Sequence, residues 1–182
     1  AEQVVQGSGL PYVILRPRAL IGRGDTVILP RVIRAHQEGR LRRMGTEQNM
    51  VDLTPVSNVV DAILLSLNAK GNALNQVYNI SNGEPIPLWP LLDDVFDRLG
   101  FEPVNKHISM HVAKCVARAL EWHAKWLNGY REPALTVYGI GTLTKTFAMD
   151  ISEARRRLGY EPRQSVENAI QEFIDWYTAS ES

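Results

Sequence analysis

Few residues of this chain have the spacing of a catalytic, metal-binding or cofactor-binding motif. His107 and His111 lie four residues apart, which would place both on one helix face, but no acidic residue joins them as in a His-Glu-x-x-His zinc site. Gly139 and Gly141 lack the third glycine of a dinucleotide-binding turn, and Ser8, between two glycines, lacks the spacing of a nucleophile elbow. Residue types alone therefore predict no metal site and no catalytic residue.

The most informative stretch is 11–25, PYVILRPRALIGRGD. It opens with the run 12–15, whose β-forming residues are typical of a strand buried on both faces. Pro17 has no N–H for a ladder, so the strand must end there or become an edge. A loop with two glycines follows, and Asp25 or Thr26 can cap a helix behind it. Because ligands sit at the carboxyl ends of strands in open parallel sheets, this loop is the first candidate for a site.

The rest of the chain alternates between strand and helix patterns, which favours an α/β protein with a parallel strand or two. Ser57 or Asn58 is expected to cap the helix that begins at residue 59. We expect strands at 11–16, 41–44, 49–56 and 76–80, the end of a helix at 1–8, helices at 27–38, 59–68, 88–99 and 152–159, one long or two short helices at 110–128, an extended or loop-like stretch at 135–149, and an amphipathic helix within 160–177.

Composition narrows the class of protein. The 182 residues are 45% hydrophobic and 22% charged, ordinary values for one globular domain or slightly more. A net charge of +0 gives no electrostatic footprint for nucleic acid. The sequence shows no secretory signal and no uncharged apolar run of about 20 residues, so we expect a cytoplasmic location. The opening AEQVVQGSG resembles the tail of a helix whose front is missing, which predicts a fragment of a longer protein.

Three single residues receive structural interpretations. Cys115, the one cysteine, excludes an intrachain disulfide and fits a reducing compartment; its apolar helical surroundings predict a buried structural thiol. Asp52 is expected to cap or hydrogen-bond backbone rather than to catalyse. Arg16 is expected to brace the loop that follows the first strand.

Four short segments, in order, resemble the C-terminal half of an extended short-chain dehydrogenase/reductase. They are LRPRALIGRGD (15–25), MVDLTPVSNVVDAI (50–63), VYNISNGEPIPLWPLL (77–92) and EARRRLGYEP (153–162). The resemblance implies the C-terminal portion of an NAD(P)-binding Rossmann-like fold, with a few mostly parallel strands, helices and a small substrate-binding lobe. Residues 1–182 would form the substrate-binding portion, with the N-terminal dinucleotide-binding half absent.

Within that superfamily, the chain is most similar to the 3β-hydroxysteroid dehydrogenase/isomerase and sterol dehydrogenase branch. The nucleotide-sugar epimerases and dehydratases are the nearest alternative, but they typically carry asparagine where Ala19 stands and a diphosphate-binding arginine near Val51. Alanine and valine offer no charge-assisted donor and suit an apolar substrate. Other β-hydroxy or β-keto substrates, such as long-chain acyl derivatives, stay open.

The resemblance also assigns ligand contacts. The backbone around Pro17, with its neighbours, would lie against the nicotinamide carboxamide, and three apolar residues would line the substrate pocket. In the alternative interpretation Pro17 merely ends a strand and the apolar residues are ordinary core. The predicted cofactor contacts are Pro17, Ala19 and Leu20, and the predicted substrate contacts are Ile21, Leu29 and Val51.

The family's catalytic apparatus is missing from this sequence. Such enzymes bind NAD or NADP at an N-terminal glycine-rich turn and use a tyrosine and lysine spaced Tyr-x-x-x-Lys for proton transfer. None of the six tyrosines has a lysine four residues on. We therefore expect the isolated chain to be inactive, with NAD or NADP held mainly by the absent half. A non-catalytic binding or assembly module is the alternative.

Segment 110–128 combines Trp122 and Trp126 with lysine and arginine. This pattern suits either a peripheral membrane contact or a helix packed over the substrate pocket with its cations in solvent. The sheet edge left open by the missing half could also pair two copies into a homodimer.

Overall fold

The computed structural model describes residues 1–44, 49–109, 111–113, 115–116, 118–119, 122 and 148–181. The chain divides into two compact units. The first comprises Ala1–Arg31, Asp52–Pro85 and Ala148–Ser182, and the second comprises Val32–Val51 and Ile86–Phe147.

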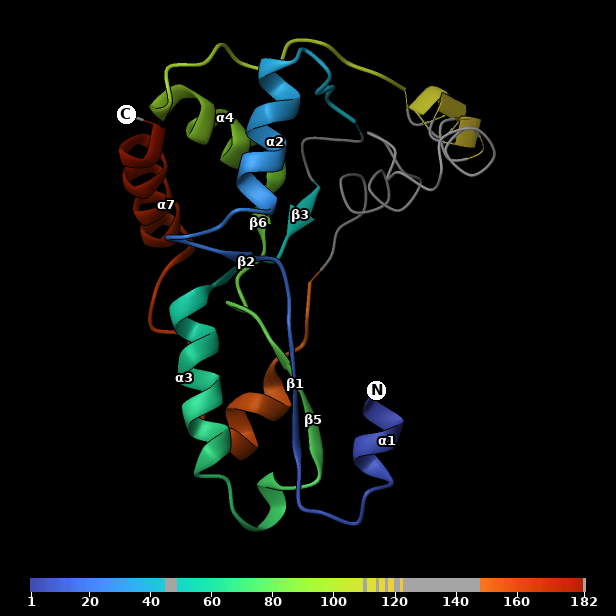
Figure 1. Cartoon of the computed structure of the whole chain (residues 1–182), viewed down its shortest axis with the longest axis vertical. Helices are drawn as coiled ribbons and strands as arrows, with labels where there is room; N and C mark the ends of the chain where they lie inside the picture. The colour runs from blue at the N-terminus through green and yellow to red at the C-terminus, as the bar shows by residue number, and fades with distance from the viewer. Residues whose placement is uncertain are drawn as a thin grey trace. The chain divides into compact units, whose positions relative to one another are not determined.

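A parallel pair of strands runs through the first unit. β1 (Val13–Pro17) pairs with β5 (Gln76–Ile80) in parallel register, so both strands end together at Pro17 and Ile80. The short helix α1 (Glu2–Gln6) precedes β1 (Figure 1). The β-forming composition thus produces the expected strands, and the parallel pairing confirms the α/β prediction.

Helix α3 (Val56–Leu67) runs alongside this strand pair (Figure 1). Its inner face places Val59 and Ala62 in an apolar core that also holds Tyr78 and Ile80 of β5. The core is closed by η1 (Gly71–Ala73) and by the π-helical segment η2 (Ala154–Leu158), whose buried members include Leu158. Side chains from α3, η1 and β5, which follow one another in the chain, therefore share one core with the distant segment η2.

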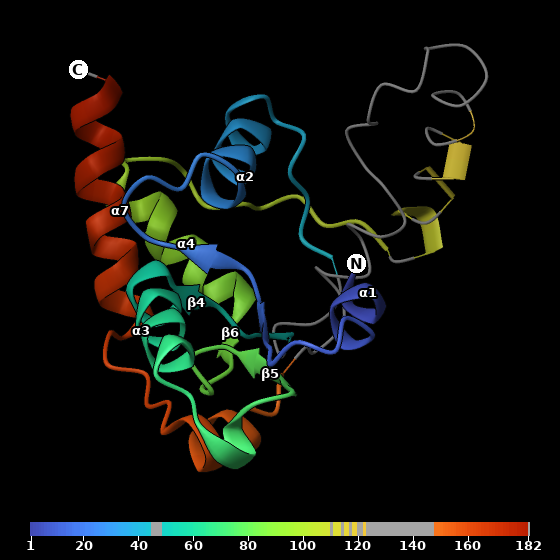
Figure 2. The same ribbon diagram turned by 60° about the horizontal axis from the view of Figure 1, so that its bottom comes forward.

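A second, shorter parallel pair continues from the first. β2 (Leu20–Ile21) pairs with β4 (Thr54–Pro55), and the closing helix α7 (Val166–Glu181) contacts both strands. Figure 2 shows α7 beginning near the first turn of α3. The buried face of α7 carries Phe173, which is 0% exposed, so this helix packs as the amphipathic pattern predicted.

The second unit has its own small core. β3 (Met50–Val51) pairs antiparallel with β6 (Ile86–Pro87), which leads into α4 (Leu88–Arg98). Helix α2 (Ile28–Gln37) crosses the boundary between the units, and its His36 stacks on Phe96 of α4 with ring centroids 4.3 Å apart. Arg43 ion-pairs with Asp93, and its guanidinium lies 5.3 Å from the ring centroid of Trp89.

Two strand predictions were wrong in detail. Residues 41–44 contain only an isolated bridge between Arg43 and His107. The segment 49–56 is not one strand, because β3 and β4 pair with different partners on either side of Asp52. Asp52, which lies between the two strands, is buried, and its carboxylate accepts the hydroxyl of Ser81.

The predicted cap of the third helix was also wrong. α3 begins at Val56 after Pro55, and no side chain caps it. Ser57 and Asn58 lie inside its first turn, where their side chains bond to Gln164 instead. Proline before the first helical residue has no N–H and fits this start.

Cys115 was predicted to be buried, but it is exposed. Ala113, two positions earlier in the same helical segment, is 0% exposed. Most of 110–128, and most of the expected extended stretch 135–149, lie outside the described residues.

Candidate functional site

The loop that follows β1 lies at the carboxyl ends of the parallel pair. Arg18 donates its N–H to the carbonyl of Ile80 at 3.3 Å, which ties the loop to the end of β5. Thr54 donates its N–H to the Ala19 carbonyl at 3.0 Å, and its hydroxyl donates to the carbonyl of Arg18. Both strand ends and β4 therefore fix the loop where a ligand is expected in an open parallel sheet.

Ala19 adopts a backbone conformation that non-glycine residues rarely use. Its φ is +44°, in the left-handed region, which costs an alanine roughly 1–2 kcal/mol. The two bonds from Thr54 hold this conformation. Such strain, persisting where surrounding bonds over-determine it, is a feature of ligand-contacting loops.

The helix behind the loop starts as the sequence predicted. The Asp25 carboxylate accepts the N–H groups of Val27, Ile28 and Leu29 at 2.8, 2.9 and 2.9 Å. These are orphan donors at a helix start, and a capping carboxylate also interacts favourably with the helix dipole. Asp25, rather than Thr26, supplies these bonds.

A buried polar cluster lies beyond the end of β5. Asp52 is 1% exposed; its Oδ2 accepts the Ser81 hydroxyl at 2.7 Å and the Met149 N–H at 3.0 Å. The prediction that Asp52 bonds backbone is confirmed. Its Oδ1 is buried without a hydrogen-bond partner among the described residues.

Tyr160 closes this cluster from the C-terminal side. It is 0% exposed and donates its hydroxyl to the carbonyl of Ser81 at 3.0 Å. Burial, with smaller contributions from Asp61 and Asp52, raises the pKa of Tyr160 to about 12. The phenol is therefore a fixed neutral donor, which suits a structural role.

The structure places the predicted cofactor residues together in the loop. Pro17 ends β1 and is exposed, while Ala19 and Leu20 are half-buried. These residues keep accessible surface at the carboxyl ends of β1 and β5. Their contact with nicotinamide stays a prediction.

The predicted substrate residues are dispersed. Ile21 and Leu29 are 0% and 3% exposed, whereas Val51 is half-buried in β3 of the second unit. None of them lines either of the two cavities described for the first unit. Their role in an apolar pocket stays a prediction.

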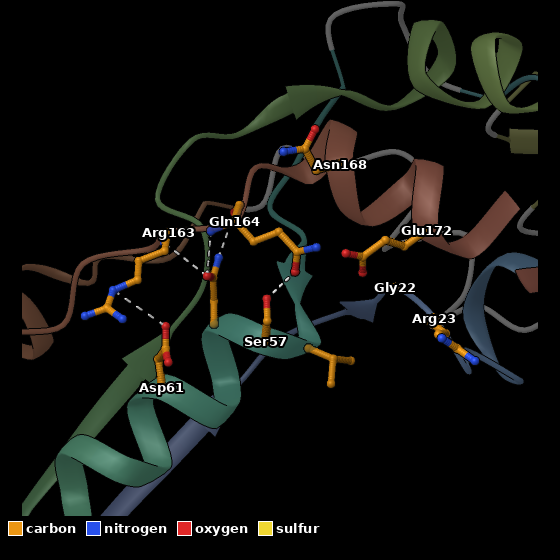
Figure 3. A pocket seen from close by; sticks show the side chains of 10 residues that line it. Gly22, Arg23, Ser57, Asp61, Arg163, Gln164, Asn168 and Glu172 are labelled. Carbon is orange, nitrogen blue, oxygen red and sulfur yellow. Dashed lines mark hydrogen bonds and ion pairs between the residues drawn. The ribbon is translucent and has the colours of Figure 1, made fainter. Parts of the chain in front are cut away.

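The larger of those cavities, about 560 Å³, lies between the first turn of α3 and the start of α7 (Figure 3). Asn58, 0% exposed, accepts the N–H groups of Arg163 and Gln164 at 3.0 Å each. The Ser57 hydroxyl donates to the Gln164 side chain, and Arg163 lies 3.9 Å from Asp61. Charged side chains of both signs and amide groups line this cavity, and their hydrogen bonds join α3 to the C-terminal segment.

Sequence reasoning missed two sets of contacts. Asn58 bonds to Asn82, Arg163 and Gln164, the last of them 106 residues away, and no local pattern reveals such contacts. Arg16 was expected to brace the loop, but it ion-pairs with Glu2 of α1, so that expectation was wrong. Among the residues the structure describes, no three His, Cys, Asp or Glu side chains gather as a metal site.

Known proteins match nearly the whole chain in sequence or in fold. The chain is 35% identical over 179 residues to a 2-alkyl-3-oxoalkanoate reductase of Stenotrophomonas maltophilia (strain K279a), covering 94% of this chain and 54% of that protein. It is 30% identical over 181 residues to the 3beta-hydroxysteroid-dehydrogenase/decarboxylase isoform 1 of Arabidopsis thaliana, covering 94% and 41%. The UDP-glucuronic acid 4-epimerase of Bacillus cereus, solved in complex with NAD, matches with a TM-score of 0.63 at 18% identity, over 100% of this chain and 49% of that one.

The chain shares its fold with solved nucleotide-sugar epimerases, which is the fold of the extended short-chain dehydrogenases/reductases that its sequence resembles. More narrowly, the chain belongs to the 3-beta hydroxysteroid dehydrogenase/isomerase family, whose model matches residues 1–111. Both resemblances inferred from the sequence are confirmed. The chain spans about half the length of the relatives that it matches.

Proposed function

We propose that this chain is the substrate-side part of an NAD(P)-dependent oxidoreductase that interconverts a hydroxyl group and a ketone on an apolar substrate. The substrate class is a 3β-hydroxysteroid or sterol, or a β-keto lipid. The two relatives described above are named for an oxo or hydroxy group at carbon 3 of an apolar skeleton. That shared chemistry, in a chain that belongs to the same family, is the observation that carries the proposal.

Two side chains support an apolar substrate over a nucleotide sugar. Ala19 and Val51 stand where the epimerase-type enzymes are expected to carry diphosphate-binding polar groups. Neither can donate a charge-assisted hydrogen bond, which a doubly charged diphosphate requires. A nucleotide-sugar substrate is therefore the weaker alternative.

The residues that this chain supplies would contact only the nicotinamide end of NAD or NADP. Pro17 is exposed at the end of β1, and the strained backbone at Ala19 lies beside it. We expect these groups to orient the nicotinamide, which accepts or supplies the hydride when NAD or NADP is bound. The phosphate-binding turn and the Tyr-x-x-x-Lys pair are not in this sequence, so the proton transfer must come from the other half of the enzyme.

Expression of the complete reading frame that contains this chain tests the proposal. The change in nicotinamide absorbance is followed with a 3β-hydroxysterol and a β-keto lipid, each with NAD(H) and NADP(H). Conversion of UDP-glucose is followed by chromatography of the nucleotide sugars, because an epimerase leaves the nicotinamide unchanged overall. We expect turnover with at least one apolar substrate and none with UDP-glucose. Turnover of UDP-sugars alone would refute the substrate class.

A binding or assembly module without catalysis is the second candidate, favoured by the lack of the Tyr-x-x-x-Lys pair in these 182 residues. The reading frame ahead of Ala1 discriminates between the two. A glycine-rich turn followed by Tyr-x-x-x-Lys supports the enzyme, and a frame that opens at Ala1 supports the module.

We further propose that the enzyme is cytoplasmic and that it attaches to a membrane surface through residues 110–128. Trp122 is 63% exposed, and tryptophan is enriched at membrane interfaces. Within the described ranges, no helix has the length and apolar character of a membrane span. Co-sedimentation with neutral and anionic liposomes tests the attachment, and its absence with both would exclude it.

A further inference from the structure

The smaller cavity of the first unit, about 230 Å³ in volume, lies between the loop that follows β5 and the segment that leads into α7. All the residues that line it belong to the first unit. Most of them are exposed or half-buried, but Asn82 is only 5% exposed. The orientation of this buried amide decides what the cavity can bind.

The orientation of the Asn82 side chain follows from its neighbour Asn58. Oδ1 of Asn58 accepts the backbone N–H groups of Arg163 and Gln164 at 3.0 Å each. The other end of that amide, Nδ2, therefore faces Asn82 and donates to its Oδ1 at 3.0 Å. Because the oxygen of Asn82 is the acceptor in this bond, its Nδ2 is left with two N–H donors.

These two donors of Asn82 open into the cavity. No described residue accepts a hydrogen bond from Nδ2 of Asn82. Among the described residues, Oδ1 of Asp52 is the one side-chain polar atom that is both cut off from solvent and without a partner. Nδ2 of Asn82 therefore keeps accessible surface, and the cavity is where a residue so deeply buried can expose it. Buried donors of this kind normally have an acceptor.

Arg155 supplies a positive charge beside this amide. Gly83, the residue after Asn82, has a φ of +71°. A Cβ atom at Gly83 would lie 2.6 Å from Cδ1 of Ile151 and 3.7 Å from Nη2 of Arg155, so the guanidinium lies close to this turn. Nε of Arg155 lies 3.5 Å from the Glu161 carboxylate. Because a guanidinium is a planar fork of five donors, this pairing leaves N–H groups for a second acceptor.

We propose that Asn82 and Arg155 form a binding subsite for a small oxyanion, that is, a carboxylate or phosphate group. Asn82 supplies neutral donors from a buried position, and Arg155 supplies charge-assisted ones. Ser165 lines the same cavity. Its hydroxyl oxygen accepts the N–H of Asn168 at 3.2 Å, which leaves the hydroxyl proton for the same ligand. No residue of the proposed cofactor loop takes part, so the inference does not depend on the proposed function.

Two other kinds of ligand use less of this cavity. A neutral acceptor would use the amide of Asn82 but not the charge of Arg155. A cation would be attracted only by Glu84, an exposed carboxylate in the cavity wall, and repelled by Arg155. Arg163 also lines the cavity, but its guanidinium extends toward Asp61 at 3.9 Å (Figure 3). An oxyanion is the class that uses both the amide and the guanidinium.

An NMR titration of the product of the complete reading frame, labelled with ¹⁵N at asparagine, tests the subsite. Sodium phosphate and sodium acetate are added separately at constant ionic strength, with sodium chloride as the reference. We expect the side-chain NH₂ signal that disappears in Asn82→Asp to shift with saturation in one or both anions. Tighter binding of phosphate would assign the subsite to phosphoryl groups, and tighter binding of acetate would assign it to carboxylates.

Three variants test the geometry. Arg155→Gln should raise the dissociation constant about tenfold, because a charge-assisted donor is lost. Arg156→Gln is the matched control and should leave it unchanged, because this neighbouring arginine pairs with Glu153 and does not line the cavity. Glu84→Gln should lower the dissociation constant about twofold, because it removes a negative charge from the wall.

The proposal fails if neither anion produces a saturating shift of the Asn82 signal. An equal shift in chloride would indicate an adventitious ion only and would also overturn it. Equal weakening in the two arginine variants would show that Arg155 has no special place in the subsite. Weaker binding of the anions by Glu84→Gln would contradict the assigned charge of the ligand.

Discussion

Thr54 donates its N–H to the carbonyl of Ala19 at 3.0 Å, and this bond joins β4 to the loop at the carboxyl end of β1. Its hydroxyl, which is buried, donates to the neighbouring carbonyl of Arg18. One threonine thus fixes two successive peptide groups of the loop that we propose to contact the nicotinamide. The geometry of the candidate site depends on a residue 35 positions away in the sequence.

The first prediction concerns that hydroxyl. Thr54→Val keeps the shape of the side chain but leaves the Arg18 carbonyl without its donor, which should cost about 1–2 kcal/mol of unfolding free energy. Urea denaturation of the isolated chain measures the change. Thr26→Val, at an exposed position of the same loop region, should change stability by less than about 0.5 kcal/mol. Equal effects of the two substitutions would contradict the proposed role of the Thr54 hydroxyl in holding the loop.

The second prediction concerns the strain at Ala19. Because glycine adopts a φ of +44° without the steric cost that alanine bears, Ala19→Gly should stabilise the chain by about 0.5 kcal/mol after the entropy of the unfolded state is included. Ala35→Gly, the same change inside α2, should destabilise it by about 1 kcal/mol. Opposite signs in urea denaturation support the left-handed conformation. A loss at both positions would argue against it.

The third prediction concerns the buried carboxylate of Asp52. Asp52→Ala leaves the Ser81 hydroxyl and the Met149 N–H without their acceptor and should cost about 2–4 kcal/mol. Asp52→Asn retains an acceptor oxygen and should cost less, because Oδ1 has no partner to lose among the described residues. Thermal unfolding followed by circular dichroism compares the variants. An asparagine variant as unstable as the alanine variant would show that charge, not hydrogen bonding, is what this site requires.

Local signals in the sequence were sufficient for some of these features. Asp25 was found as a helix cap because its partners are the next few residues, and the strands β1 and β5 were found from their β-forming composition. Ser57 and Asn58 were misassigned as caps because both side chains bond to Gln164, more than a hundred residues away. The break between β3 and β4 at Asp52 was also missed, because the partners of Asp52 are the distant residues Ser81 and Met149. The loop was predicted as a site from its place after a strand, whereas its strained conformation depends on distant Thr54.

The fourth prediction is a pH dependence. The pKa of Tyr160 is raised from 10.0 to about 12 by burial. Between these values the unfolded chain has lost the phenolic proton and the folded chain keeps it, so stability falls as pH rises from about 10 to 12 and is unaffected by this group below about 10.

Tyr160→Phe should reduce that slope in urea titrations at alkaline pH. A smaller slope should remain from Tyr78, whose pKa burial also raises. The variant also loses the bond to the Ser81 carbonyl, which should lower stability at neutral pH by about 1 kcal/mol. An unchanged alkaline slope would show that Tyr160 is not buried as described.

The most direct test of the central proposal is steady-state turnover by two proteins side by side, the isolated 182-residue chain and the product of its complete reading frame. We predict that the complete product oxidises or reduces nicotinamide with a 3β-hydroxysterol or a β-keto lipid, and that the isolated chain does so with neither. Turnover by the isolated chain, or activity of the complete product with UDP-sugars but with no apolar substrate, would contradict it.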